Sequence, residues 1–189
     1  MAEPSNSGPL QGIKVVDLTR VLSGPFCTML LADMGADVIK IETPDKGDPV
    51  RGQGDVVDGL SWYFAAFNRN KRSITLDLRA DEGKRILEQL IEGADVLVEN
   101  FRPGILDKMG LTKERLEALN PRLITTSVNG FGSTGPYRDR PAFDFIAQAM
   151  SGFMAVNGVE GEDPMRAAPP IADLIAGLYG AFGTLAALH

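Results

Sequence analysis

Short apolar segments alternate with helix-forming segments along most of the chain, and this alternation constrains the fold more than any other feature. Ile13–Asp17 is an apolar run that ends in an acid, and Asp37–Glu42 is a second run of this kind. Between them, Phe26–Met34 can form a helix that ends at Gly35. A strand, a helix and a strand with short connections are typical of a parallel βαβ unit. The sequence therefore predicts an α/β fold, with a parallel sheet flanked by helices.

The alternation continues through residue 128 without an internal repeat or a linker that would mark a second domain. The clearest helix is Asp81–Glu92, where the apolar residues form one stripe and charged residues cover much of the rest. The other predicted strands are Ser73–Leu78, Asp95–Glu99 and Leu123–Val128, the other predicted helices are Thr112–Leu119, Asp144–Gly152 and the segment headed by Asp173, and the predicted loops are Gly47–Gly59 and the stretch from Gly152 to Pro170.

The composition argues against several classes of function. The 189 residues include 25 Asp and Glu against 19 Lys and Arg, and the net charge of −6 gives no general attraction to nucleic acid. Cys27 is the only cysteine, which excludes an intrachain disulfide and a cysteine-based zinc site, so we expect a reducing, cytoplasmic setting. The only histidine is His189, the last residue, which argues against Ser-His-Asp or Cys-His catalysis.

The two ends of the sequence carry no targeting signal that we recognise. Residues 1–11 are polar and lack an apolar centre, so we expect a flexible arm rather than a signal peptide. Leu174–Leu188 is apolar but short for a bilayer and rich in Gly and Ala, which predicts a buried helix and no membrane span. Because the sequence stops inside this apolar pattern, without a C-cap, we expect a piece of a longer protein.

Three loops carry possible binding groups. Gly130–Gly135 matches the G-x-G-x-x-G spacing, but Pro136 and Pro141 follow where a dinucleotide site needs a helix to begin, so we reject nucleotide binding there. Asn68–Ser73 holds three positive charges and is either a solvated loop or a docking patch for a phosphorylated ligand. Asn100–Gly104 follows a predicted parallel strand, so it is either a simple turn or part of a ligand site at that sheet edge.

Asp173 is the strongest candidate for a reactive group. As the head of an apolar helix it is either a helix cap or a partly desolvated nucleophile, since a helix N-terminus stabilises an anion. Gly177, Gly180 and Gly183 would let other backbones approach that helix closely. Cys27 fits a small buried thiol better than a reactive one.

Several motifs together resemble the family III CoA-transferases, the group that includes formyl-CoA transferase and the CaiB/BaiF proteins. The resemblance is carried by Gly12–Pro25, Gly35–Glu42, Gly47–Arg51, Asn68–Asp77, Ala94–Gly110, Gly130–Pro136, Asp144–Gly152 and Pro169–Gly180. It implies that residues 12–189 are the N-terminal part of a Rossmann-like large domain that binds coenzyme A, with a small domain and the remainder lying outside this sequence. It also implies an interlocked homodimer.

The resemblance implies roles for individual residues. Asp173 would be the nucleophile, forming an aspartyl anhydride with the acyl donor and then an aspartyl-CoA thioester from which a carboxylic acid takes the CoA. The implied coenzyme A contacts are Leu22, Ser23, Leu76, Arg79, Asn100, Phe101, Arg102 and Lys108, and the implied acyl-pocket residues are Gly130, Phe131 and Gly132. Thr43 departs from relatives that have Arg there. Coenzyme A enters as a substrate, and no metal or redox cofactor is implied.

Two other functions stay open at this point. The same fold resembles α-methylacyl-CoA racemase, which uses a His and an Asp, but Phe143 stands where that His would be and cannot exchange a proton. A CoA-binding or assembly module without turnover is the second alternative. The acyl donor and the carboxylate acceptor do not follow from the sequence.

Overall fold

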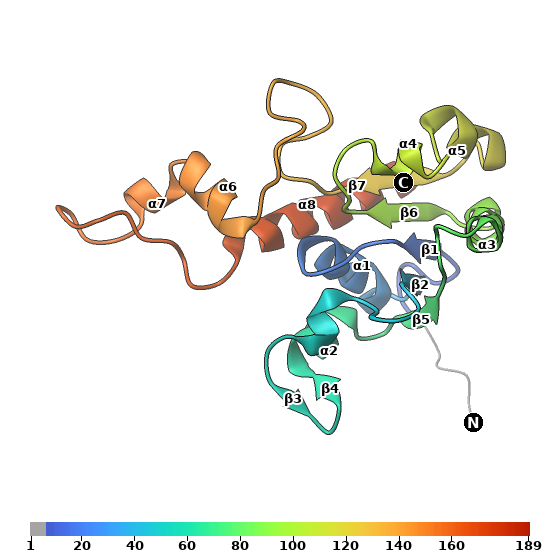
Figure 1. Ribbon diagram of the computed structural model, residues 1–189, viewed down its shortest axis with the longest axis horizontal. Coiled ribbons are helices and arrows are strands. Elements are labelled where there is room, and N and C mark those ends of the chain that lie inside the picture. The colour runs from blue at the N-terminus through green and yellow to red at the C-terminus, as the bar shows by residue number, and fades with distance from the viewer. Residues whose placement is uncertain (1–6) are drawn as a thin grey trace.

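In the computed structural model, which describes residues 7–189, five parallel strands form one sheet (Figure 1). The strands are β1 (Lys14–Asp17), β2 (Asp37–Glu42), β5 (Arg72–Thr75), β6 (Val96–Glu99) and β7 (Ile124–Ser127). They lie in the order β5-β2-β1-β6-β7, and every neighbouring pair is parallel. The chain therefore builds outward from β1 in both directions, and the order of strands reverses between β1 and β6. Ligands of open α/β sheets bind beside the carboxyl ends of the strands at such a point.

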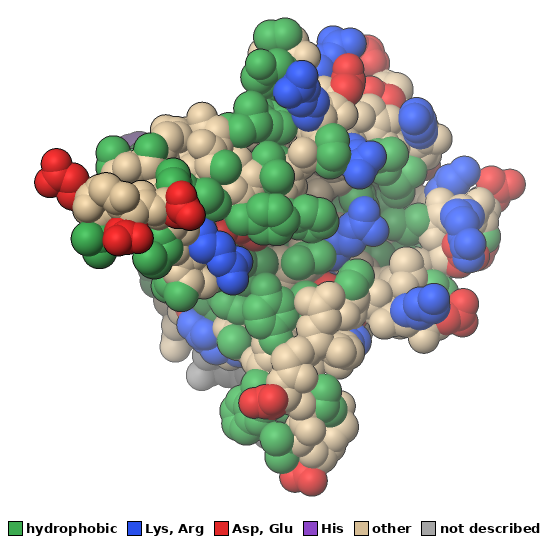
Figure 2. Space-filling model, turned by 60° about the vertical axis from the view of Figure 1, so that its left-hand side comes forward, with side chains coloured by type: hydrophobic (Ala, Val, Ile, Leu, Met, Phe, Trp, Pro, Cys, Tyr) green, Lys and Arg blue, Asp and Glu red, His purple; other side chains and the backbone are tan. Residues whose placement is uncertain are grey.

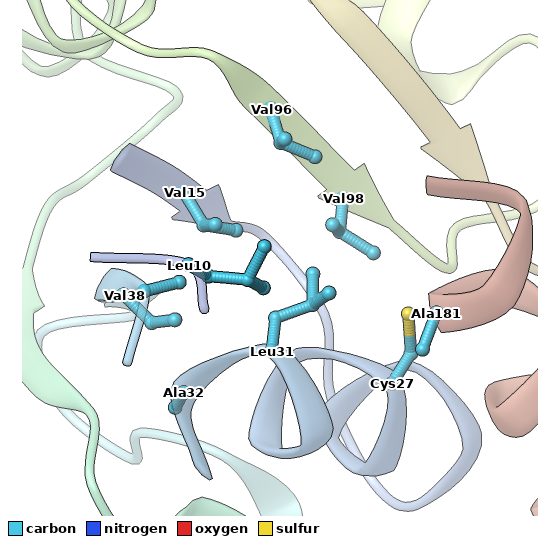
Figure 3. Packing of buried hydrophobic residues seen from close by; sticks show 10 residues of the cluster. Leu10, Val15, Cys27, Leu31, Ala32, Val38, Val96, Val98 and Ala181 are labelled. Carbon is cyan, nitrogen blue, oxygen red and sulfur yellow. The ribbon is translucent and has the colours of Figure 1, made fainter. Parts of the chain in front are cut away.

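Alternate residues of the central strands enter two separate cores. Val15, Val96 and Val98 point to one face, where helix α1 (Ser23–Asp33) packs with helix α8 (Ile171–Leu188). Figure 3 shows Cys27 of α1 beside Ala181 of α8 at this contact. Val16 and Leu97 point to the other face and pack under helices α3 (Asp81–Glu92) and α5 (Lys113–Leu119). The sheet is thus covered on both faces, as a parallel sheet requires.

The main predicted elements are present, with shifted ends. Helix α1 begins three residues before the predicted start at Phe26, because Pro25 lies in the first helical turn, where no backbone N–H is needed. Helix α3 has the predicted bounds, and Thr112 caps α5 by accepting a hydrogen bond from the Arg115 N–H. Strand β5 ends before the predicted Ser73–Leu78 does: the Leu76 N–H still donates to the Glu42 carbonyl over 2.9 Å, but a turn begins at Leu78.

Both predicted loops contain regular structure, so those two predictions were wrong. The segment from Gly47 to Gly59 includes a 3-10 helix, Pro49–Gly52, and β3 (Val56–Val57), which pairs with β4 (Leu60–Ser61) as a hairpin. Helix α2 (Trp62–Asn68) follows, capped by the Ser61 side chain. The further short helices are α4 (Ile105–Lys108), α6 (Asp144–Met150) and α7 (Phe153–Val156), the last of which lies inside the second predicted loop.

Helix α8 is not the buried helix that its composition predicts. It packs on α1 along a narrow stripe that includes Gly177, Ala181 and Thr184, and large apolar side chains remain outside. These exposed side chains, with those of α6, form what we call the outer apolar surface: Phe145, Met150, Ile175, Leu178, Tyr179 and Phe182. Hydrophobic side chains gather across the middle of the face seen in Figure 2. By length and composition alone, α8 could cross a membrane.

The glycines of α8 differ in their surroundings. A Cβ on Gly177 would lie 2.4 Å from the Ser23 carbonyl oxygen, and one on Gly180 would lie 3.2 Å from the Cys27 sulfur, so both permit the close approach to α1. A Cβ on Gly183 would meet nothing within 4 Å, so the expectation of close approach was wrong at that position.

The predicted N-terminal arm is described only from residue 7 onward. Leu10 is buried in the α1 core, and its backbone N–H donates to the Met34 carbonyl over 2.9 Å. Regular packing in the described residues therefore begins before residue 12, and residues 1–6 lie outside the described part.

Candidate active site

A cavity of about 580 Å³ opens beside the carboxyl ends of β1, β2 and β5. Its walls are Thr19 and Arg20 of the first βα turn, the loop from Thr43 to Pro49, and the segment from Leu76 to Arg79. Phe101, which follows β6, completes it. The Arg20 guanidinium lies 5.6 Å from the centre of the Phe101 ring. The cavity thus lies where the strand order reverses, the expected position for a ligand.

The structure brings together only some of the predicted coenzyme A contacts. Leu76, Arg79 and Phe101 line this cavity. Arg79 is paired with Asp77 at 2.9 Å and stays largely exposed, so its charge is accessible. Arg20 and Lys46 also line the cavity, and no described carboxylate lies within salt-bridge distance of either cation.

The remaining predicted contacts lie elsewhere. Leu22 is buried, and the Ser23 hydroxyl donates to the backbone oxygen of Asp173 over 2.8 Å. Asn100 clamps Arg20: its side-chain oxygen accepts from the Arg20 N–H and its amide donates to the Arg20 carbonyl, at 2.9 and 2.8 Å. Arg102 lines a second cavity of about 590 Å³ between β7 and helices α4 and α5, and Lys108 lines neither cavity.

Beneath the first βα turn lies a buried charge cluster, which the sequence analysis missed. It consists of Asp17, Lys40, Asp48 and Lys71. Lys40 pairs with Asp48 at 2.9 Å, and Lys71 pairs with Asp17 at 3.1 Å. Burial alone would raise the pKa of Asp17, but both lysines and the hydroxyls of Thr19 and Thr28 hold that pKa below its usual value. Burial lowers the pKa of Lys71 to about 8.

A second carboxylate near the cavity is also held by side chains. Glu42 ends β2 and receives two hydrogen bonds from the Arg51 guanidinium, both at 2.6 Å. The Asp48 backbone N–H donates to the same carboxylate over 2.8 Å. These bonds and one from Ser73 outweigh the effect of burial and lower the pKa of Glu42 to about 2. The signal for this site was present in the sequence as Gly47–Arg51, a motif that carried the family resemblance but received no role.

The three positive charges of the basic segment Asn68–Ser73 are all paired with carboxylates. Arg69 pairs with Asp33 of α1, and Arg72 pairs with Asp37 of β2. Lys71 is buried in the charge cluster. Carboxylates from distant parts of the sequence therefore pair with all three charges. The Arg69 and Arg72 side chains stay 53% and 65% exposed, as a solvated loop predicts, and the pairing leaves none of the three charges free for a phosphorylated ligand.

Asp173 does not cap its own helix. Asp144, at the start of α6, accepts hydrogen bonds from the Ala172 and Asp173 N–H groups with one carboxylate oxygen, at 2.8 and 3.3 Å. Gln148 donates to the other oxygen over 2.6 Å. Within residues 7–189, no group donates a hydrogen bond to the Asp173 carboxylate. Its pKa is raised to about 6, first by burial and then by the charge of Asp144.

The charge of Asp173 also acts on Tyr63 of α2. The pKa of Tyr63 is raised by burial and then by the charges of Asp173 and Asp48. The Ser23 hydrogen bond to its backbone oxygen locates Asp173 beside the first βα turn.

The loop after β7 does not begin a helix, as the sequence analysis expected. The next helix starts only at Asp144. A Cβ on Gly130 would lie 2.3 Å from the Ala142 Cβ, so glycine allows the two ends of this loop to touch. Gly132 has a φ of 78° and donates its N–H to Asn129, and Phe131 packs edge-on against Tyr137.

Cys27 is a buried thiol, as its sequence context favours. It is fully buried in the α1 core, and burial followed by the charge of Asp17 raises its pKa to about 12. The thiolate is therefore scarce at neutral pH.

Comparison with known proteins accounts for nearly the whole chain. The sequence profile of CoA-transferase family III matches residues 10–189. Succinate–glutarate CoA-transferase of Agrobacterium fabrum is 46% identical over 98% of this chain and 48% of its own length. Formyl-CoA:oxalate CoA-transferase of Streptomyces avermitilis is 48% identical over 95% of this chain and 44% of its own length.

A solved structure matches the same extent of the chain. The crystal structure of a CaiB/BaiF family protein from Brucella suis superposes with a TM-score of 0.91 at 46% identity, covering 96% of this chain and 49% of that one. The chain thus spans about half the length of the curated relatives that it matches.

Proposed function

The chain belongs to CoA-transferase family III, and we propose that it supplies the nucleophile and much of the coenzyme A site of an enzyme that moves CoA from an acyl-CoA thioester to a carboxylic acid. The enzyme would be about twice as long as this chain, because its relatives are. Residues 1–189 would be inactive alone.

The position of Asp173 carries this proposal. Its carboxylate lies at the N-terminus of α8, partly buried, beside the turn that borders the cavity. The pKa of about 6 leaves the carboxylate ionised at neutral pH but more basic than an ordinary aspartate, and a more basic oxygen is a better nucleophile. Because no described group donates a hydrogen bond to this carboxylate, its oxygens have no such bond to break before they attack.

The proposed chemistry balances without an added reactant. An Asp173 oxygen attacks the thioester carbonyl and the C–S bond breaks. CoA departs as the thiolate, and the acyl group stays on Asp173 as a mixed anhydride. The thiolate then attacks the aspartyl carbonyl, releasing the donor carboxylate and leaving an aspartyl-CoA thioester. The acceptor carboxylate attacks that thioester to form a second anhydride, and CoA thiolate attacks its acyl carbonyl. The products are the new acyl-CoA and the restored carboxylate.

Coenzyme A would occupy the cavity at the sheet edge. Leu76 and Phe101 offer apolar surface to an adenine ring, and Arg79 offers a charge-assisted donor to a phosphate. Arg20 and Lys46 add two cations that the sequence analysis did not assign. Asn100, Arg102 and Lys108 stay proposed contacts at the β6 side, whereas Leu22 is almost completely buried.

The acceptor class is a short dicarboxylate. Several relatives are named for succinate, glutarate and oxalate. An acid of this kind would approach Asp173 from the loop Gly130–Gly132, which we propose as part of the acyl pocket.

The outer apolar surface supports a larger assembly. Soluble proteins rarely leave a contiguous apolar area of this kind uncovered, so we propose that the rest of the polypeptide or a second copy covers it, as in an interlocked homodimer. A protein that uses acyl-CoA in this way would act in the cytoplasm.

The test is to trap the intermediate. The complete protein is incubated with a panel of acyl-CoA thioesters, treated with hydroxylamine or borohydride, and analysed by peptide mass spectrometry. The expected result is a modification at Asp173 that is absent in Asp173→Asn and present in Asp163→Asn, a control at an exposed loop carboxylate. Its formation should slow as the pH falls through about 6, since the protonated acid does not attack.

Two results would assign another function. Entry of solvent deuterium at the substrate α-carbon without any adduct would indicate a racemase, although Phe143 is apolar and 65% exposed where that enzyme needs a base. Binding of CoA without either reaction would indicate a CoA-binding module.

A further inference from the structure

The first βα turn contains a backbone conformation that its sequence disfavours. Val21 has a φ of 71°, in the left-handed region where a β-branched side chain is a genuine outlier. It follows Arg20, which lines the cavity, and precedes Leu22, where α1 is capped. Such a conformation persists only where the surroundings hold it, and it often occurs at a functional site.

Three side chains from other segments hold three consecutive residues of this turn. Lys40 donates to the Thr19 carbonyl over 2.7 Å, and Asn100 bonds both backbone groups of Arg20. The N–H of Val21 itself points between the two Asp48 carboxylate oxygens, at 3.1 and 3.3 Å. The strained residue is therefore fixed by Asp48.

Asp48 is itself held from two sides. Its carboxylate pairs with the Lys40 ammonium, and each of these side chains is only 1% exposed. Its backbone N–H donates to Glu42, which Arg51 binds through two hydrogen bonds. Buried ion pairs often add little stability over an apolar pair of similar volume, so stability alone does not explain a charge placed here.

We propose that Asp48 is a positioning residue for acyl-CoA: it holds Val21 in the left-handed conformation and so fixes the Arg20–Ser23 turn between the cavity and Asp173. The function of the turn rests on the proposed function, whereas the hold on Val21 does not. Removing the Asp48 carboxylate should let Val21 relax and displace the turn. Glycine adopts a positive φ without a steric cost, so Val21→Gly should partly restore the turn in that background.

The experiment is a double-mutant cycle in the complete protein, with Asp48→Ala, Val21→Gly, both together, and Asp55→Ala as a control at an exposed carboxylate. Amide hydrogen exchange is measured without ligand, and coenzyme A binding is measured by calorimetry. Asp48→Ala also removes the partner of the buried Lys40, so exchange is expected to rise in general, but more at residues 19–22 than in β6, and CoA binding should weaken at least tenfold. Adding Val21→Gly should recover at least threefold of that loss. Asp48→Asn, which keeps an oxygen for the Val21 N–H, should stay closer to the wild type than Asp48→Ala.

Several results would overturn the proposal. Unchanged exchange at residues 19–22 would do so, and so would an increase there no larger than that in β1, β2 and β6, which indicates a structural role alone. If Asp48→Ala fails to fold, restored folding on adding Val21→Gly supports the proposal and its absence refutes it. A wild-type protein that does not bind CoA refutes the proposed function, and the exchange data then decide the role of Asp48.

Discussion

Two regions of this molecule reverse the usual distribution of polarity, in opposite directions. Beneath the first βα turn, four charged side chains are buried: Asp17, Lys40, Asp48 and Lys71. On the outer apolar surface, Tyr179 and Phe182 are 68% and 67% exposed. The first region is complete in itself, because every carboxylate there has an ammonium partner and hydroxyl or backbone bonds. The second has side chains without apolar neighbours to cover them.

The first region is closed by contacts within the chain, whereas the second is left exposed by the described residues. The sheet, its two cores and the charge cluster are closed by contacts among residues 7–129 and α8. Helices α6 and α7 and the loop after them extend away from the sheet (Figure 1). Substitutions in the closed region should therefore change stability more than substitutions on the outer apolar surface.

Removing one charge from the cluster should lower the free energy of unfolding more than any other substitution proposed below. Lys71→Met leaves the Asp17 carboxylate buried beside Thr28 without its ammonium partner, and breaking such a pair typically destabilises a protein by about 3–5 kcal/mol. Urea denaturation of the complete protein measures the free energy of unfolding. The control is Arg85→Met, which breaks an exposed pair with Glu82 and should cost less than about 1 kcal/mol. Equal costs for the two variants would contradict the closed cluster.

The contact between α1 and α8 should tolerate no added atom at one glycine. Gly177→Ala places a Cβ within 2.4 Å of the Ser23 carbonyl oxygen, so the helices must separate at an expected cost of about 3 kcal/mol. Gly183→Ala is the matched control on the same helix, because its Cβ meets nothing and alanine favours the helix by about 1 kcal/mol. Thermal unfolding of both variants compares them. A stable Gly177→Ala protein would show that α8 does not pack as described.

Asp173 should destabilise the folded protein at neutral pH. Its folded pKa of about 6 lies above the unfolded value, so the folded state binds the proton more tightly, and stability falls as the pH rises from about 4 to 6. Asp173→Asn should therefore raise the free energy of unfolding by about 2 kcal/mol at pH 7 to 8, and the gain should shrink toward pH 4. Denaturation curves across this range, beside Asp163→Asn, measure it. A gain that does not change with pH would argue against the raised pKa.

The smallest effects should come from two neighbouring positions on α8. Thr184→Val removes the hydroxyl that bonds Thr126 of β7 over 2.7 Å, with an expected cost of about 1 kcal/mol. Phe182→Ser changes a far larger side chain but should cost less than about 0.5 kcal/mol in this 189-residue chain, because that ring is already exposed. Urea denaturation of this chain measures both. A clearly larger cost of Phe182→Ser in the complete protein would show that the surface is covered there.

The sequence predicts the sheet well because its signals are local. Segments such as Ile13–Asp17 and Asp81–Glu92 carry a periodic pattern that packing on a sheet reinforces. The prediction that helix α8 is buried was wrong, because composition shows that a side chain is apolar but not whether another segment covers it. The hairpin of β3 and β4 is too short for a periodic signal.

The candidate site was predictable only in part, for a related reason. Phe101 follows a predicted strand, and the family resemblance implied Leu76 and Arg79; all three line the cavity. The pairs Lys40–Asp48 and Lys71–Asp17 join residues that are separated in the sequence, so no spacing announces them. The charges of Asn68–Ser73 look unpaired in the sequence, because their partners lie on α1, β1 and β2.

The position of β1 at the middle of the sheet has a consequence for synthesis. Chains are made from the N-terminus, and β1 is made first. Strand β2 then joins one edge of β1, β5 joins β2, β6 joins the other edge of β1, and β7 joins β6. Each strand that leaves the ribosome therefore finds its partner already present, and no gap has to wait for a later segment. The nascent sheet grows by addition at its edges.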